Sequence, residues 1–268
     1  MSDDDKVFAG SIPENYDRHM VPLIFESYAR DIAQRVATLS PKAVLETAAG
    51  SGVVTRALAS VLAPDAGYVV TDLNQPMLDY AKAKQGADSR IRWHKADAQS
   101  LPFEDAAFDL VCCQFGVMFF PDRPSGYREA KRVLKPGGVF LFNAWDRIEE
   151  NVFADDVTKA LAALFPNDPP RFLARTPHGY HDTTLIRSDL AKAGFIDVAI
   201  ETREAPSRAA SPRDVALAYC QGTPLRNEIE ARGNLEAATN YAASAIERRH
   251  GSGEVSAKIQ AHVILARA

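Results

Sequence analysis

The chain has 268 residues, of which 46% are hydrophobic and 25% charged, so it is long enough to bury a core without disulfides or a structural metal. Its formal net charge of −4 argues against nucleic acid as the main partner, because phosphate binding requires a basic face. The acidic start, Met-Ser-Asp-Asp-Asp, is followed by no apolar segment, and the longest apolar runs have only the length of strands. We therefore expect a cytoplasmic protein with no signal peptide and no membrane partner.

The first half of the chain predicts a regular alternation of strands and helices. Residues 1–12 are expected to form a tail, and two helical stretches follow between Pro13 and Leu39. Strands are then predicted at 43–45, 67–71, 90–94, 108–113 and 139–144, with helices at 53–62, 75–84 and 125–134. Short strands alternating with helices of this length indicate a parallel sheet covered by helices on both faces.

The second half is less regular. Helices are predicted at 152–164, 183–193, 212–221 and 235–249, strands at 196–202 and 256–267, and a Pro-rich loop at 165–180. The sequence shows no composition shift that would separate a second domain. We therefore expect one domain in three parts: an N-terminal tail with lid helices at 1–40, a nucleotide-binding core at 41–146, and an insertion with the remaining strands at 147–268.

A glycine loop lies between the first predicted strand and the helix that follows it. The loop, Glu46-Thr-Ala-Ala-Gly50-Ser-Gly52, has small residues where a ligand could approach the backbone, and the helix start offers unpaired N–H groups. Asp72 ends the second strand, where a carboxylate meets the ribose hydroxyls of nucleosides in doubly wound folds. The loop and Asp72 together predict a nucleoside site.

The same stretch resembles the class I S-adenosylmethionine-dependent methyltransferases, in the branch of the ubiquinone/menaquinone-biosynthesis C-methyltransferases. The similar segments are Val44–Thr55, Val70–Leu78, Lys95–Phe103, Phe108–Val111 and Arg132–Gly138, in the order and spacing of the family. The resemblance implies a three-layer α/β/α Rossmann-like sandwich with a mostly parallel seven-stranded sheet, an antiparallel last strand and a helical cap. It also implies S-adenosyl-L-methionine as methyl donor and S-adenosyl-L-homocysteine as product.

The resemblance further implies which residues hold the donor. Glu46 and the loop would approach the methionine moiety, Asp72 the ribose, and Asp97 the adenine amino group. The full set predicted to bind the donor is Tyr16, Glu46, Ala48, Gly50, Gly52, Asp72, Leu73, Met77, Asp97, Ala98 and Gln114. Leu73 or Met77 would pack on adenine, Gln114 would line the donor, and Tyr16 would act from a lid helix. The family usually has Asp and Gly where this chain has Glu46 and Ala48.

The acceptor is harder to predict, because methyl transfer from a sulfonium mainly requires alignment, and a base only if the acceptor loses a proton. His178 and His181, which flank Tyr180 in a loop after the fifth strand, are the candidate catalytic residues. Asn143 and Trp145 at the end of that strand are candidates to line the acceptor pocket. We expect a small-molecule acceptor with apolar surface and no metal, leave the attacked atom open, and regard a homodimer as compatible with the sequence.

Two other functions stay open from the sequence. One is a protein that binds S-adenosylmethionine without catalysis. The other is a nicotinamide-dependent oxidoreductase, because Tyr80-x-x-x-Lys84 and Tyr127-x-x-x-Lys131 imitate the dehydrogenase pair of the short-chain family. Both pairs precede the fifth strand rather than follow it, and the loop lacks a Gly-x-x-x-Gly-x-Gly spacing, so methyl transfer is favoured.

Overall fold

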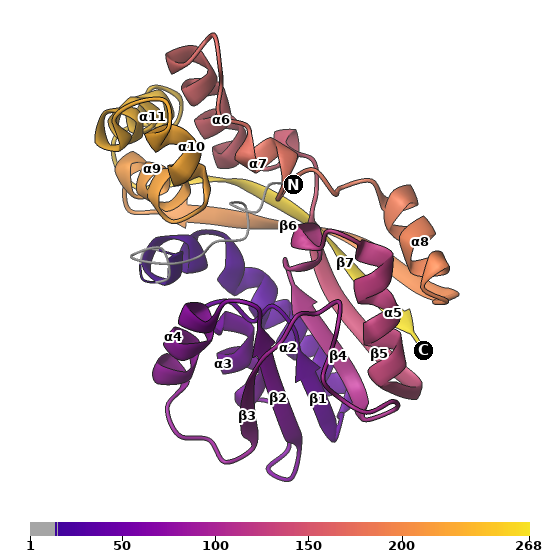
Figure 1. Ribbon diagram of the computed structural model, residues 1–268. Coiled ribbons are helices and arrows are strands. Elements are labelled where there is room, and N and C mark those ends of the chain that lie inside the picture. The colour runs from indigo at the N-terminus through magenta and orange to yellow at the C-terminus, as the bar shows by residue number, and fades with distance from the viewer. Residues whose placement is uncertain (1–13, 15) are drawn as a thin grey trace.

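The computed structural model describes residue 14 and residues 16–268, and the tail expected at 1–12 lies outside them. One sheet of seven strands runs through the molecule in the order β3-β2-β1-β4-β5-β7-β6 (Figure 1). The strands are β1 (Ala43–Glu46), β2 (Gly67–Asp72), β3 (Ile91–Lys95), β4 (Phe108–Gln114), β5 (Leu134–Trp145), β6 (Asp197–Ala209) and β7 (Val255–Arg267). β1 to β5 pair in parallel, and β7 runs antiparallel to both β5 and β6. The expected fold, with an antiparallel last strand, is confirmed.

Helices cover both faces of this sheet, because alternate residues of its central strands are apolar on both sides. Val139 and Leu141 of β5 join one buried cluster, whereas Phe140 and Phe142 join the other. The first cluster is completed by α2 (Glu26–Leu39), α3 (Val53–Ala59) and α4 (Gln75–Gln85), and the second by α5 (Arg123–Val133) and α8 (Thr183–Lys192). The result is a three-layer sandwich.

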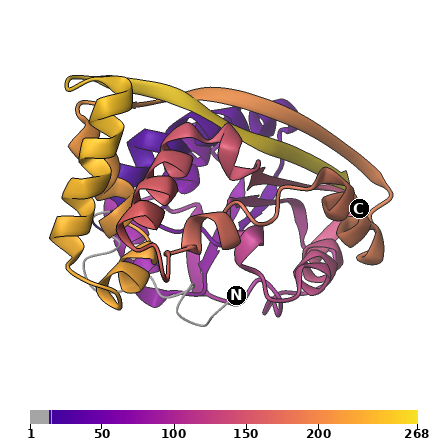
Figure 2. The same ribbon diagram turned by 90° about the horizontal axis from the view of Figure 1, so that it is seen from above.

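A helical cap lies over the carboxyl ends of the parallel strands (Figures 1 and 2). Its elements are η2 (Tyr16–Phe25), α6 (Val152–Leu164), α7 (Phe172–Arg175), α9 (Pro212–Gln221), α10 (Leu225–Glu230) and α11 (Leu235–His250). The β6–β7 pair extends beyond the sheet towards these helices (Figure 2). Two short 3₁₀ turns, η3 (Val117–Phe119) and η4 (Ile148–Glu150), follow β4 and β5. In the part of the chain that the structure describes, no helix is both long and apolar enough to cross a membrane.

The structure differs from the sequence expectations mainly in the length of elements. β6 extends to Ala209 because each of its residues pairs with β7, although its polar residues from Thr202 onward give no strand signal. β5 begins at Leu134, the last residue of the predicted helix and five residues before the predicted strand, because Leu134 pairs with Phe108 across an irregularity in the register. The short helices α7, inside the loop predicted at 165–180, and α10 were not predicted, and η2 is a π-helix with Pro22 inside it rather than an α-helix.

Candidate active site

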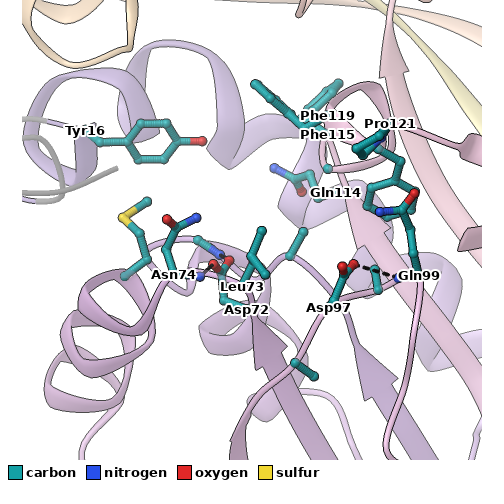
Figure 3. Close-up of a pocket in the computed structure, with 17 residues that line it drawn as sticks. Tyr16, Asp72, Leu73, Asn74, Asp97, Gln99, Gln114, Phe115, Phe119 and Pro121 are labelled. Carbon is teal, nitrogen blue, oxygen red and sulfur yellow. Dashed lines mark hydrogen bonds between the residues drawn. The ribbon is translucent and has the colours of Figure 1, made fainter. Parts of the chain in front are cut away.

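A cavity of about 840 Å³ opens at the carboxyl ends of the parallel strands, between the sheet and η2. All of the residues predicted to bind the donor line it except Glu46 and Gly52. Figure 3 shows Tyr16 with its hydroxyl directed into the space, across from Asp97 and Gln99, while Asp72 lies at the end of its strand. Ligands of open α/β sheets bind at this edge, so the cavity is the candidate active site.

The glycine loop forms the floor of the cavity by a run of left-handed backbone. Ala48, Gly50 and Gly52 have φ values of 52°, 57° and 83°. A Cβ atom on Gly52 would lie 2.9 Å from Cβ of Ala81, so Gly52 allows α4 to pack closely and does not itself line the cavity. Gly50 lies at the surface of the cavity and donates its N–H to Asp72. Gly52 therefore allows close helix packing, whereas Gly50 shapes the surface of the cavity.

Ala48, which departs from the family pattern, is accommodated by a neighbouring glycine. A Cβ atom on Gly116 would lie only 2.5 Å from Cβ of Ala48, so the lack of a side chain at Gly116 leaves room for the methyl group of Ala48. Gly116 follows the end of β4, directly across the cavity floor from the loop. The backbone of the loop thus keeps its shape despite the larger residue.

Asp72 is held in one orientation by the backbone. Its Oδ2 accepts a hydrogen bond from the Gly50 N–H at 2.8 Å, and its Oδ1 accepts one from the Asn74 N–H at 2.7 Å. The side chain is buried, and burial raises its pKa above the ordinary range despite these hydrogen bonds. A buried carboxylate of fixed orientation in a cavity suits the paired hydroxyls of a ribose.

Glu46 lies in a second cavity of about 300 Å³, which shares Tyr16, Ala48, Gly50 and Gln114 with the first. Its Oε2 accepts hydrogen bonds from the Thr55 hydroxyl at 2.7 Å and from the Tyr68 hydroxyl. Burial raises the pKa of Glu46 to about 7, because the two hydrogen bonds offset only part of the desolvation. The carboxyl group is therefore available to ionise when a cationic partner binds.

Two buried polar atoms beside Glu46 have no protein partner among the described residues. They are Oγ of Ser51, which lines the second cavity, and Oε1 of Gln114, whose amide nitrogen donates to the Phe25 carbonyl. Buried polar atoms are normally hydrogen-bonded, so these two atoms suit a polar ligand. Together with the N–H groups at the start of α3, they fit the amino-acid end of S-adenosylmethionine.

The charged side chains that line the two cavities are all acidic. Glu46, Asp72 and Asp97 contribute carboxyl groups, and the described residues that line the cavities include no lysine or arginine. Such a lining favours a cation and disfavours a diphosphate. S-adenosylmethionine carries a sulfonium and an ammonium group, whereas a nicotinamide dinucleotide carries a diphosphate.

The sequence expectations missed the part of the cavity that follows β4. Phe115, Gly116, Phe119, Phe120 and Pro121 all line it. Phe115, the first residue after β4, has a left-handed φ of 53°. The position of this segment directly after the carboxyl end of β4 was the available signal, because loops at that edge carry binding residues. Asn74, beside Asp72, and Gln99, near Asp97, were also missed (Figure 3).

The dehydrogenase-like pairs have structural partners outside the cavities. Tyr80 donates its hydroxyl to Asp17 at 3.1 Å, and Lys84 forms an ion pair with the same carboxylate. Tyr127 is buried and donates its hydroxyl to the Tyr180 hydroxyl at 3.2 Å, while Lys131 donates to the Gly194 carbonyl. Neither pair lines the first cavity, so the contacts of both pairs are explained without hydride chemistry.

The two candidate histidines lie in different places. His178 and Trp145 line a third cavity, of about 480 Å³, that adjoins the first through Tyr16, Phe115 and Phe119. His181 is exposed and lines none of these cavities; its Nδ1 bonds the His178 carbonyl at 2.9 Å. Asn143 is fully buried in β5, and both of its side-chain polar atoms lack a described partner.

The sequence of this chain is similar to those of known methyltransferases. Residues 45–142 match the family described as a methyltransferase domain. The chain is 29% identical over 164 residues to the ubiquinone/menaquinone biosynthesis C-methyltransferase UbiE of Pseudomonas aeruginosa, covering 57% of this chain and 64% of that protein. It is 36% identical over 153 residues to UbiE of Bartonella tribocorum, covering 54% of this chain and 58% of the relative. The match thus spans less than two thirds of the length of these relatives.

The fold is shared with solved structures. A candidate methyltransferase from Bacillus halodurans superimposes with a TM-score of 0.56 at 21% identity, covering 89% of this chain and 97% of the other. At this identity the likeness shows the Rossmann-like methyltransferase fold alone. The resemblance to class I methyltransferases seen in the motifs is confirmed by the family match and the two relatives.

Proposed function

We propose that this chain is an S-adenosylmethionine-dependent methyltransferase that acts on a small-molecule acceptor. The observation that carries the proposal is the charge of the first and second cavities, which we call the donor cavities. Three carboxyl groups and no described lysine or arginine line this space at the carboxyl ends of the parallel strands. The family match over residues 45–142 supports the same reading.

We assign the donor contacts as follows. Asp72 holds the ribose hydroxyls, while Glu46, with Ser51 and Gln114 beside it, receives the amino-acid end. Leu73 and Met77 lie against the adenine, with Asp97 and Ala98 at its polar edge. Tyr16 lies at the junction of all three cavities, where the reacting groups would meet. When bound, the donor supplies a methyl group on a positively charged sulfur; the chain's residues position it and exclude water.

We also propose roles for the three parts of the chain, its location in the cell and its partners. The core at 41–146 binds the donor, the segments at 1–40 and 147–268 form the acceptor side, and the protein acts in the cytoplasm without nucleic acid or membrane. Subunit association as a homodimer is compatible with this arrangement and is tested by light scattering.

Calorimetric titration with S-adenosylmethionine, S-adenosylhomocysteine and NAD tests the donor assignment. We expect both sulfur compounds to bind at micromolar concentration and to raise the melting temperature, and NAD to do neither. Binding of NAD instead would overturn the proposal. Formation of S-adenosylhomocysteine with a panel of acceptors then tests catalysis, and donor binding without turnover of any acceptor would indicate a donor-binding protein.

A further inference from the structure

Asn143 places an amide group in a largely apolar part of β5. Its side chain is fully buried, and neither Oδ1 nor Nδ2 has a hydrogen-bond partner among the described residues. Leu141 lies two positions earlier on the same face of the sheet, and the register partner of Asn143 on β7 is Val263. Asn143 lines none of the three cavities. Any role in the site therefore has to act through a neighbouring side chain.

The neighbour on the other side of Asn143 is Gln114. β4 and β5 pair in parallel, and Gln114 at the end of β4 is the register partner of Asn143. Strands in a sheet lie about 4.8 Å apart, and paired residues direct their side chains to the same face. The preceding pair on this face, Cys112 and Leu141, belongs to one buried cluster, so the two strands are in phase here. The two amide side chains therefore lie side by side.

The amide of Gln114 connects the donor cavities to η2. Its Nε2 donates to the Phe25 carbonyl at 3.1 Å, so its Oε1 points away from that carbonyl. Phe25 is the last residue of η2, and its ring stacks on Tyr16 with centroids 5.1 Å apart. Gln114 and Tyr16 both line the two donor cavities. The direction of the Gln114 amide therefore matters to the shape of the donor site.

Three buried polar atoms on these neighbouring strands have no described partner: Oε1 of Gln114, and Oδ1 and Nδ2 of Asn143. Only Nδ2 can donate a hydrogen bond, and Oε1 is the only one of the two oxygens on another residue. The terminal torsion of an asparagine side chain is soft, so Nδ2 can turn towards Oε1 without a change in the backbone. An amide oxygen accepts two hydrogen bonds, so Oε1 keeps a second lone pair for a ligand.

Asn143 is an unfavourable residue for folding. Even when Nδ2 donates to Gln114, Oδ1 has no partner among the described residues. A buried polar atom without a partner lowers stability, whereas an apolar residue of similar shape avoids this cost. Residues that conflict with their local surroundings are expected where they serve a functional site. The adjacent site is the pair of donor cavities.

We propose that Asn143 is a positioning residue of the donor site. It donates a hydrogen bond to Oε1 of Gln114 and so holds the Gln114 amide between the Phe25 carbonyl and the donor cavities. The inference rests on the proposed function, in which Gln114 lies beside the amino-acid end of S-adenosylmethionine. Because Gln114 is held before the donor arrives, binding does not have to order this side chain, and the affinity is higher.

A matched pair of variants at position 143 tests the hydrogen bond. Asn143→Val and Asn143→Thr have nearly the same shape, but only the threonine hydroxyl can donate to Oε1. In calorimetric titration, Asn143→Val should bind S-adenosylhomocysteine about fivefold more weakly than the parent, and Asn143→Thr should recover part of this loss. Asn143→Val should unfold at an equal or higher denaturant concentration, because it removes the unpaired oxygen. An equal loss of affinity and of stability in both variants indicates a structural role and overturns the proposal.

The Gln114→Met background shows whether the effect passes through Gln114. Methionine has the length of glutamine but no amide, so Asn143→Val in this background should change the affinity for S-adenosylhomocysteine by less than twofold. A fivefold loss in both backgrounds overturns the proposal. Asn227→Val on α10 is the control for the same exchange, because Asn227 is exposed and lines none of the three cavities.

A measurement on the parent protein does not depend on how the variants fold. In nuclear magnetic resonance spectra of the complex with S-adenosylhomocysteine, the side-chain amide protons of Asn143 should exchange slowly with solvent and show a nuclear Overhauser contact to the Gln114 side chain. Fast exchange without this contact overturns the proposal. Equal binding of S-adenosylhomocysteine by the parent and Asn143→Val rejects this inference alone, whereas no binding by the parent rejects the proposed function.

Discussion

Asp72 is the residue on which donor binding depends most directly. Asp72→Ala removes the carboxylate that we assign to the ribose and leaves the Gly50 and Asn74 N–H groups without their acceptor. We expect donor affinity to fall by about 100-fold, or about 3 kcal/mol, measured by calorimetric titration. Asp65→Ala, an exposed carboxylate paired with Lys42 before the same strand, is the control. Unchanged affinity in Asp72→Ala would remove the ribose assignment.

Glu46 predicts a pH dependence of donor binding. Its pKa of about 7 in the free protein means that the carboxyl group is largely protonated at pH 6 and ionised at pH 8. Because the ionised form attracts the donor cation, affinity should increase as the pH rises through 7, by up to about tenfold per unit below that value. Glu46→Gln keeps an oxygen that can accept from Thr55 and should give a flat profile between pH 6 and 8. A parent protein with an equally flat profile would contradict this.

At the scale of single residues, the sequence indicated polar residues that line the cavity and missed the shape of the cavity. Asp72 and Gly50 could be predicted because they follow strands in a fixed pattern. The compensation of Ala48 by Gly116 could not, because it joins two loops that are distant in the chain. His178 and His181 could not be distinguished by sequence, since both lie in one loop and only the fold decides which one lines a cavity.

Among the elements, η2 packs on the core through buried apolar side chains and carries one carboxylate that joins it to two core helices. Asp17 lies 3.1 Å from the Arg56 guanidinium of α3 and accepts from Tyr80 of α4 at 3.1 Å, with Lys84 at 3.6 Å. Its neighbour Tyr16 stacks on Phe25 with centroids 5.1 Å apart and lines all three cavities. Asp17 therefore holds the helix that covers the donor cavity.

Asp17→Asn should loosen this cover. We expect the donor to dissociate several-fold faster, because one weakened charge network no longer keeps Tyr16 over the cavity, while the association rate changes little. Stopped-flow fluorescence measures both rates. Asp79→Asn on α4, an exposed carboxylate that accepts a hydrogen bond from Gln75, serves as the control. An unchanged dissociation rate would show that η2 does not restrict donor exit.

The elements that the sequence predicted poorly are those whose form depends on partners. β6 is polar along its second half and is a strand because β7 supplies the hydrogen bonds. η2 carries Pro22 and apolar residues that predict a helix of some kind, but the π-helical form depends on packing against α2 and α9. By contrast, the strands β1, β2 and β4 are short, largely apolar runs bounded by turns, which local sequence is sufficient to indicate.

For the molecule as a whole, the parallel core was predictable because each βα unit carries its own pattern, and handedness and layer order follow from it. The position of the cap was not, since its aromatic residues come from segments between Tyr16 and Pro224 that meet only in the folded protein. This division has a consequence for stability, because each region buries a titratable group with a strongly shifted pKa, Glu46 in the core and His178 under the cap.

The free energy of unfolding should report these two groups with opposite sign. Between pH 4.5 and 6.5, Glu46 is protonated in the folded state and increasingly ionised in the unfolded state, because its folded pKa is about 7, so its contribution falls as the pH rises. His178 is neutral in the folded state, because its pKa is about 4, and charged in the unfolded state, so its contribution rises with pH. Each slope approaches about 1.4 kcal/mol per pH unit, so the two nearly cancel in the parent protein.

Denaturant titrations at several pH values separate the two contributions. Glu46→Gln removes the Glu46 slope, so stability should increase with pH between 4.5 and 6.5 relative to the parent. His178→Asn removes the His178 slope, so stability should decrease over the same range relative to the parent. The double variant should regain the parent's pH dependence, because the two sites lie in separate cavities and their free energies add. Parallel pH profiles for both single variants would contradict the buried state of these groups.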